Sequence, residues 1–141
     1  MGTQAELRRQ SERFELLLNL TTRITSSLDL REVLRAIAAN IREVIHADAV
    51  TVALPDPASE KFKVFAMDFP HGKGIIKEEL LVTPSPAHRK AMDTLRPVFV
   101  DARERNELSP EVHDIAAAEG FKAACAIPLV NRARAVGLLS I

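Results

Sequence analysis

The chain has 141 residues, 47% hydrophobic and 27% charged, which is ordinary for one soluble globular domain. Lys plus Arg and Asp plus Glu number 19 each, so no net field favours nucleic acid or an anionic membrane as a partner. The single cysteine excludes an internal disulfide and a cysteine-rich zinc site. No apolar run approaches the roughly 18 residues of a membrane span, and the N-terminus has no apolar signal sequence, so a cytoplasmic location is expected.

The N-terminal segment, from about residue 4 to residue 27, is predicted to form one long helix because it contains neither Gly nor Pro. Between Leu7 and Leu28, apolar residues fall on the a and d positions of a heptad, with two polar interruptions. Two interpretations stay open. The helix either packs on its own domain or pairs with a second copy of the chain. The pattern slightly favours the second, so residues 1–28 are expected to be a dimerisation and signalling helix of a homodimer.

A second helix is predicted to begin at Asp29, because Asp29 and Glu32 have the spacing of a capping box. It should end near His46. Its apolar residues recur at the i, i+3, i+4 spacing of a helix that packs on a core. They are Val33, Leu34, Ile37, Ala38, Ile41, Val44 and Ile45.

Two strands are predicted next, over residues 49–54 and 61–69, and a turn rich in proline joins them into a hairpin. The first strand is nearly all apolar, which is typical of an inner strand. In the second strand, alternation places Phe62, Val64 and Ala66 on one face.

The middle connection is predicted to hold two short helices. Ser85 and Ser109 are each followed by proline, the pattern of an N-cap and a first helical residue. The first helix should end before Arg96, which precedes a proline, and the second at Gly120. A short strand over residues 98–100 lies between them.

The segment from Gly120 to Ile141 is predicted to be a β-hairpin, since two apolar runs flank the polar turn of residues 131–134. The last run ends at Ile141 with no cap or polar tail, and the chain is therefore expected to be a piece of a longer protein. Together these elements predict an α+β fold with a central antiparallel sheet. The long N-terminal helices should cover one face, and the short helices and loops should roof a cavity on the other.

Four stretches of the chain carry a family resemblance: Ser27–Leu34, Ala47–Leu54, Arg96–Asp101 and Gly120–Leu139. Together they resemble a GAF domain. The resemblance covers about residues 20–141, and the domain itself is expected over residues 29–141. Asp68–Gly74 (Asp-Phe-Pro-His-Gly-Lys-Gly) is similar to the GAF domains of formate hydrogenlyase activators, which are sensory domains of bacterial sigma-54-dependent transcription activators. Such domains finish with one more helix, so the resemblance implies a C-terminal truncation.

The resemblance implies a domain that senses a small molecule and passes its ligand state through helices to an output domain. The alternative is a module that only dimerises and positions its neighbours, without a ligand. An enzyme is not expected, because the family's methionine sulfoxide reductase needs several cysteines. The single cysteine is also in no context typical of bilin attachment, and no signature for a cyclic nucleotide is found. The four histidines are scattered, so no metal site is expected.

Five residues are the candidates for contacting a ligand, which is expected to be a small anion such as formate rather than a bound cofactor. His88 and Arg89 lie in the first short helix, and Arg103 follows the short strand. The N–H groups at the two helix N-termini would favour an anion as well. Cys125 and Phe65 complete the set. For the cations, solvated surface charge is the more ordinary interpretation, and for Cys125 it is a small buried hydrophobe.

The two functions make different demands on the cavity. An open, polar-lined pocket would favour a sensor. A cavity filled by Phe65, Phe69, Phe99 or Met92 would favour a scaffold. The sequence identifies neither the ligand nor the output domain.

Overall fold

The structure, a computed structural model, describes residues 3–13, 27–102 and 107–141. The strands are β1 (Val50–Pro55), β2 (Phe62–Asp68), β3 (Leu81–Val82), β4 (Val98–Asp101), β5 (Ala123–Asn131) and β6 (Arg134–Ser140). They form one six-stranded sheet in the order β3-β2-β1-β6-β5-β4. Every pair of neighbours is antiparallel, as predicted.

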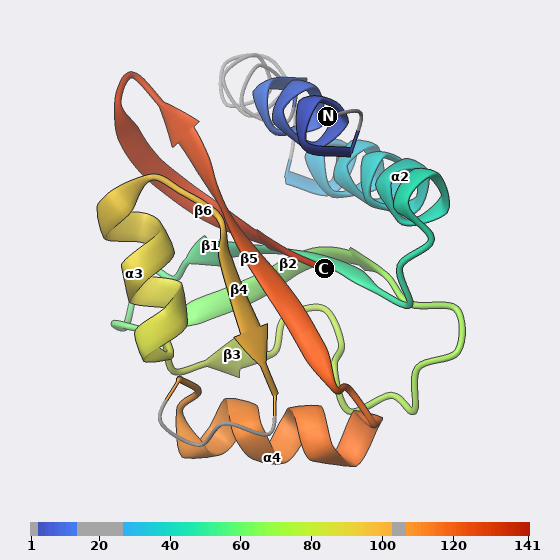
Figure 1. The fold of residues 1–141 in the computed structure, drawn as a ribbon, viewed down its shortest axis with the longest axis vertical. Coiled ribbons are helices and arrows are strands. Elements are labelled where there is room, and N and C mark those ends of the chain that lie inside the picture. Colours follow the sequence, from blue (N-terminus) through green and yellow to red (C-terminus); the bar gives the residue numbers. More distant parts are fainter. Residues whose placement is uncertain (1–2, 14–26, 103–106) are drawn as a thin grey trace.

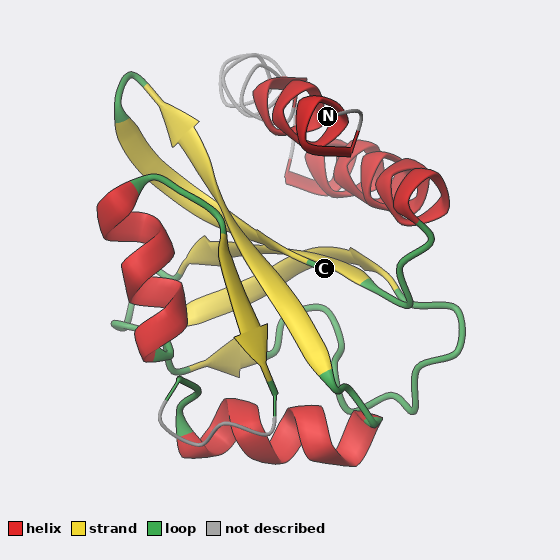
Figure 2. Ribbon diagram, viewed as in Figure 1, coloured by secondary structure: helices red, strands yellow, loops and turns green. Residues whose placement is uncertain are grey.

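Helices cover the two faces of this sheet (Figure 1, Figure 2). They are α2 (Ser27–Ile45), α3 (Pro86–Thr94) and α4 (Pro110–Glu119), together with a helical segment over residues 3–13. The segment 3–13 and α2 lie on one face, while α3 and α4 pack on the other face and beside its edge. The predicted α+β class and this division of the helices are confirmed. Among the described helices, none has the length and apolarity needed to cross a bilayer.

Helix α2 is held by an apolar stripe against the middle of the sheet. Leu34 and Ile41 are fully buried there, in one cluster with residues of β1, β5 and β6. The helix begins at Ser27, two residues before the predicted N-cap, and ends at Ile45 because His46 turns into the left-handed region at φ 55°. Val44 is 47% exposed and does not pack on the sheet as the stripe predicted.

The N-terminal segment 3–13 packs on its own domain. Leu7 contacts the α2 cluster, and the Ser11 hydroxyl donates a 3.5 Å hydrogen bond to the carbonyl of Pro128 in β5. This contact is the one expected of a helix that covers its own sheet. Pairing with a second copy stays a prediction, and residues 14–26, over which one continuous helix was predicted, lie outside the described residues.

A β-bulge in β2 changes the predicted alternation. Val52 pairs with Ala66 and Ala53 pairs with Val64, so Phe65 is the extra residue in β2. A bulge shifts the alternation by one residue. Val64 therefore faces away from α2, while Ala66 and Phe65 both pack toward α2. The prediction that Ala66 shares the face of Val64 is wrong for this reason.

The two short helices begin and end as predicted. Ser85 and Ser109 have the extended backbone of N-caps, with ψ angles of 162° and 154°, and a proline follows each. Leu95 ends α3 and Gly120 ends α4, both in the left-handed region, at φ 58° and 86°. Local chain chemistry thus determines where this pair of helices begins and ends.

Candidate functional site: a cavity under the short helices

A cavity of about 150 Å³ lies between the sheet and the short helices. Its floor is formed by residues of all six strands, and its walls by α3, α4 and the connection between β2 and β3. The floor is hollow because five of its residues in or beside β1 and β5 are alanines, whose side chains end at Cβ. These are Ala49, Ala53, Ala123, Ala124 and Ala126. The helices on this face of the sheet form the roof, and the small side chains leave the space below it.

The lining is uncharged throughout the described residues. Most of it is aliphatic, and no Lys, Arg, Asp or Glu of the described residues lines the cavity. The side-chain hydroxyls come from Thr51 and Ser140, which are cross-strand partners of β1 and β6. The remaining polar side chain is the imidazole of His88 in α3.

The tautomer of His88 follows from one hydrogen bond. Nδ1 accepts from the main-chain N–H of Ser85 at 3.1 Å, so Nδ1 carries no proton and the neutral ring is protonated on Nε2. Burial lowers the pKa of His88, since it disfavours the charged imidazolium. The ring is therefore neutral near pH 7. No described residue accepts a hydrogen bond from Nε2.

The N-termini of α3 and α4 are joined by their own capping residues. The N–H of Ser109 donates to Oγ of Ser85 at 2.8 Å, and Oγ of Ser109 accepts from the N–H of Val112 at 3.3 Å. The N–H of Ser85 is taken by His88, and the N–H of Ala87 by the carbonyl of Glu107. These amides are therefore occupied and not available to an anion. The expectation that they would bind one is wrong for this reason.

A buried carboxylate holds the connection that forms one wall. Glu119, at the end of α4, is 8% exposed and accepts hydrogen bonds from the N–H groups of Lys73 and Ile76, at 2.8 and 3.0 Å. Burial alone would raise the pKa of Glu119, but hydrogen bonds from the N–H groups of Ile76, Lys73 and Ile75 outweigh it and lower that pKa. Ile76 itself lines the cavity.

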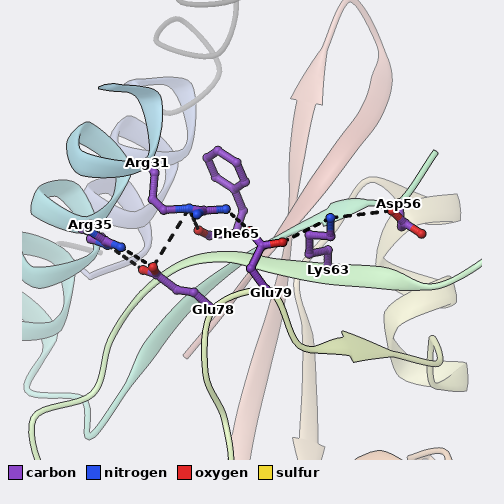
Figure 3. A network of polar contacts seen from close by, with 7 residues as sticks. All are labelled: Arg31, Arg35, Asp56, Lys63, Phe65, Glu78 and Glu79. Atoms are coloured by element: carbon purple, nitrogen blue, oxygen red, sulfur yellow. Dashed lines mark hydrogen bonds and ion pairs between the residues drawn. The ribbon is translucent and has the colours of Figure 1, made fainter. Parts of the chain in front are cut away.

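The other end of this connection is bound to α2 through a network of ion pairs (Figure 3). Arg31 of α2 pairs with Glu79, and its Nε donates to the carbonyl of Phe65 at 2.9 Å. Arg35, one turn further along α2, binds Glu78 through two hydrogen bonds, one of them 2.6 Å long. The pKa of Glu78 is lowered, chiefly by the hydrogen bond from Arg35. Leu80, the next residue after Glu79, lines the cavity.

The five predicted ligand residues separate in the structure. His88 and Cys125 line the cavity, although Cys125 also packs with Ile127 in the cluster beneath α2. Arg89 is exposed and outside the cavity lining, because consecutive helical residues point about 100° apart. Phe65 lies on the α2 face, where the Arg31 guanidinium stacks 4.7 Å from its ring centroid. Arg103 lies outside the described residues.

The four side chains named as possible plugs do not line the cavity. Phe65 faces α2, Phe99 is 75% exposed, and Phe69 stacks on Phe121 with 5.2 Å between ring centroids. Met92 packs beside Ala91 in another cluster. The space is therefore not filled by the side chains that the scaffold alternative named, but its largely aliphatic lining is not the polar lining expected of a sensor either.

Two sets of residues at the site were missed from the sequence. Glu119 lies in the last turn of its helix, where a negative charge is unfavourable beside the helix dipole. This unfavourable position could have indicated that its carboxylate has a partner elsewhere in the fold. Arg31 and Arg35 are four residues apart on α2 and so share a helix face. The adjacent acidic pair Glu78 and Glu79 is their complement. Only the folded chain brings these two pairs together.

Metal and thiol chemistry receive no support from the residues that the structure describes. They contain no cluster of three or more His, Cys, Asp or Glu side chains placed to hold a metal ion. Burial raises the pKa of the Cys125 thiol, which makes the reactive thiolate scarce.

Comparison with known proteins matches residues 29–141 to the GAF domain. The fold is similar to the GAF domain/HD domain protein from Geobacter sulfurreducens, with TM-score 0.65, 16% identity, and 79% of this chain and 72% of that chain covered. It is also similar to the GAF domain of a two-component sensor histidine kinase from Bacillus halodurans, with TM-score 0.58, 19% identity, and coverage of 74% and 69%.

An enzyme shares the fold as well. The type II free methionine-R-sulfoxide reductase from Thermoplasma acidophilum gives TM-score 0.60 at 13% identity, with 82% of this chain and 74% of that chain covered. No curated protein sequence matches the chain. The family match extends over most of the chain and agrees with the six-stranded sheet and its cavity. The chain belongs to the GAF domain family.

Proposed function

We propose that this GAF domain is a sensor that binds a small molecule in the cavity and transmits its ligand state to the helices on the opposite face. GAF domains, including those of sensor histidine kinases, are sensory regulatory modules. One observation carries the proposal for this chain. Ile76 and Leu80 line the cavity, while Glu78 and Glu79, between them, bind Arg31 and Arg35 of α2.

This arrangement gives the ligand a route to the other layer. In this proposal, a ligand that displaces the backbone at Ile76 or Leu80 also displaces Glu78 and Glu79, because all four belong to one short segment. The ion pairs then alter the position of α2, beside which residues 3–13 lie. A ligand shifts such an equilibrium only by its differential affinity for the two positions of the segment.

The wider setting of the domain is part of the proposal. The stretch Asp68–Gly74 supports a parent protein of the formate hydrogenlyase activator type, a sigma-54-dependent regulator of transcription. There the helices would pass the signal to an output domain, and pairing through residues 1–28 would make the homodimer. In the structure this stretch anchors the cavity wall, since Phe69 stacks on Phe121 and Lys73 donates to Glu119.

The test combines binding and transmission. Methyl groups of Val64, Leu80 and Val112 are labelled for NMR, and the domain is titrated with a fragment set of small anions, including formate, and neutral molecules. Binding in the cavity should perturb all three methyl groups, and hydrogen exchange of the α2 amides should change with ligand. Ala126→Phe, which places a ring in the cavity, should abolish both effects.

A matched variant isolates the transmission step. Arg35→Gln breaks the ion pair to Glu78 on the surface, away from the cavity lining. It should leave the methyl shifts intact and reduce the response of α2. If no fragment perturbs the cavity methyl groups, the sensor proposal fails and the scaffold without a ligand is left.

A further inference from the structure

The chemistry of the cavity lining restricts the ligand more than its shape does. The described lining offers aliphatic and aromatic carbon, two hydroxyls, the Cys125 thiol and one neutral imidazole. A carboxylate placed there would lose its hydration without gaining a cation, since the described lining residues include no Lys or Arg. Against the part of the lining that the structure describes, a small anion such as formate is poorly matched and a neutral ligand is well matched.

The size of the cavity sets the second restriction. Its volume is about 150 Å³. An apolar cavity of about that volume in another protein accepts benzene. The space thus suits one six-membered ring and is too small for a nucleotide or a bilin.

The third restriction comes from His88. Its Nδ1 is occupied by the Ser85 amide, so Nε2–H is the donor left on the ring. The Thr51 and Ser140 hydroxyls can rotate and can both donate and accept, whereas Nε2–H in the neutral ring can only donate, in a direction set by the ring. A ligand oxygen beside Nε2–H would give this donor an acceptor inside the cavity.

We propose that the cavity takes a neutral, largely apolar molecule of about one six-membered ring that carries an oxygen acceptor, and that Nε2–H of His88 donates to this oxygen. This inference rests on the proposed sensor function and narrows its ligand class. Cyclic ketones have the required chemistry: a hydrocarbon body for the alanine-lined floor and one carbonyl oxygen for His88.

The experiment compares three probes on the intact chain: cyclohexanone, its near-isostere methylenecyclohexane, and formate. Affinities are measured from the methyl shifts of Val64 and Leu80, and the Nε2–H resonance of His88 is followed by ¹⁵N NMR. Cyclohexanone should bind about three- to tenfold more tightly than methylenecyclohexane, the ratio that one net hydrogen bond gives. Cyclohexanone alone should shift the Nε2–H resonance, and formate should not bind.

Two variants assign the preference to its residue. His88→Phe keeps a ring but removes the donor, and should bind both cyclic probes equally. Thr51→Val removes a hydroxyl at constant shape and should keep the wild-type preference. The wild-type Nε2–H shift provides the same information if His88→Phe does not fold.

The outcomes distinguish a failure of the proposed ligand class from a failure of the proposed sensor function. If formate binds and cyclohexanone does not, the domain still binds a ligand but the ligand class is wrong. Equal binding of the two cyclic probes by the wild type, or a preference lost in Thr51→Val, overturns the role of His88. If none of the three probes perturbs the cavity methyl groups, the ligand class is wrong, and the wider fragment set decides on the sensor itself.

Discussion

Ser109 donates its main-chain N–H to Oγ of Ser85 at 2.8 Å, and this hydrogen bond joins the N-termini of α3 and α4. Ser85 is fully buried, with an exposed fraction of 0%, and its own N–H is bound to His88. One serine thus positions both the second short helix and the imidazole that lines the cavity. The roof of the cavity depends on this buried polar contact as well as on apolar packing.

Ser85→Ala should destabilise the domain by about 1–3 kcal/mol, because the Ser109 N–H is left buried without an acceptor. Urea unfolding measures the change. Thr94→Ala is the control, since its hydroxyl donates only to the Lys90 carbonyl on an exposed face of the same helix. Thr94→Ala should lower the free energy of unfolding by less than about 0.5 kcal/mol. Similar losses in the two variants would show that the link between the helices contributes nothing beyond an ordinary surface contact.

Glu119→Gln should lower stability by about 1–3 kcal/mol at pH 7, because one of its two acceptor oxygens becomes an NH₂ group facing main-chain N–H donors. The exposed Glu60→Gln serves as control. Hydrogen exchange should locate the loss in residues 73–76. Unchanged protection there would contradict the role given to Glu119.

The same carboxylate predicts a pH dependence with a definite sign. The pKa of Glu119 is lower in the folded state than in the unfolded state. Its ionised form therefore stabilises the fold above the unfolded pKa, and this contribution is lost as the pH falls through the folded pKa. The stability difference between the wild type and Glu119→Gln should shrink over that acidic range. If the stability difference instead grows on acidification, folding must raise the pKa of Glu119 rather than lower it.

The sequence predicted the parts of the fold that short segments determine. The Ser-Pro pairs at Ser85 and Ser109 and the glycine at Gly120 act within one helical turn, and these boundaries were right. The face of Ala66 was wrong because the bulge at Phe65 arises from pairing with β1, which local alternation does not contain. Elements were thus more predictable than the exact pairing between them.

The site was less predictable than the fold, for the same physical reason. His88 and Arg89 are neighbours in sequence, but only the packing of α3 on the sheet determines which of them faces the cavity. An anion was expected partly because Arg89 is charged, but the neutral His88 is the residue that lines the cavity. The links from Glu78 and Glu79 to α2 join residues more than 40 positions apart, beyond any spacing rule.

The turn between β5 and β6 contains removable strain. Arg132 and Ala133 have φ angles of 52° and 62°, a region that favours glycine or asparagine. Ala133→Gly should raise the free energy of unfolding by about 0.5–1 kcal/mol, measured by thermal unfolding. This is the net effect of the relieved strain and the greater entropy of the unfolded chain. Ala58→Gly, in an exposed turn without positive φ, should be neutral or destabilising. If the two substitutions lower stability alike, the turn of residues 131–134 is not strained.

Cys125 tests whether the cavity exposes a reactive thiol. The residue is 8% exposed, and burial raises the pKa of its thiol, so both access and thiolate content are low. Its alkylation by iodoacetamide at pH 8 should be at least about a hundredfold slower than in urea, because reaction requires transient opening of the core. Ala58→Cys, in a Cys125→Ala background, supplies an exposed thiol for comparison. If Cys125 reacts as fast as that thiol, the cavity admits the reagent to the thiol without opening of the core, and a redox role regains support.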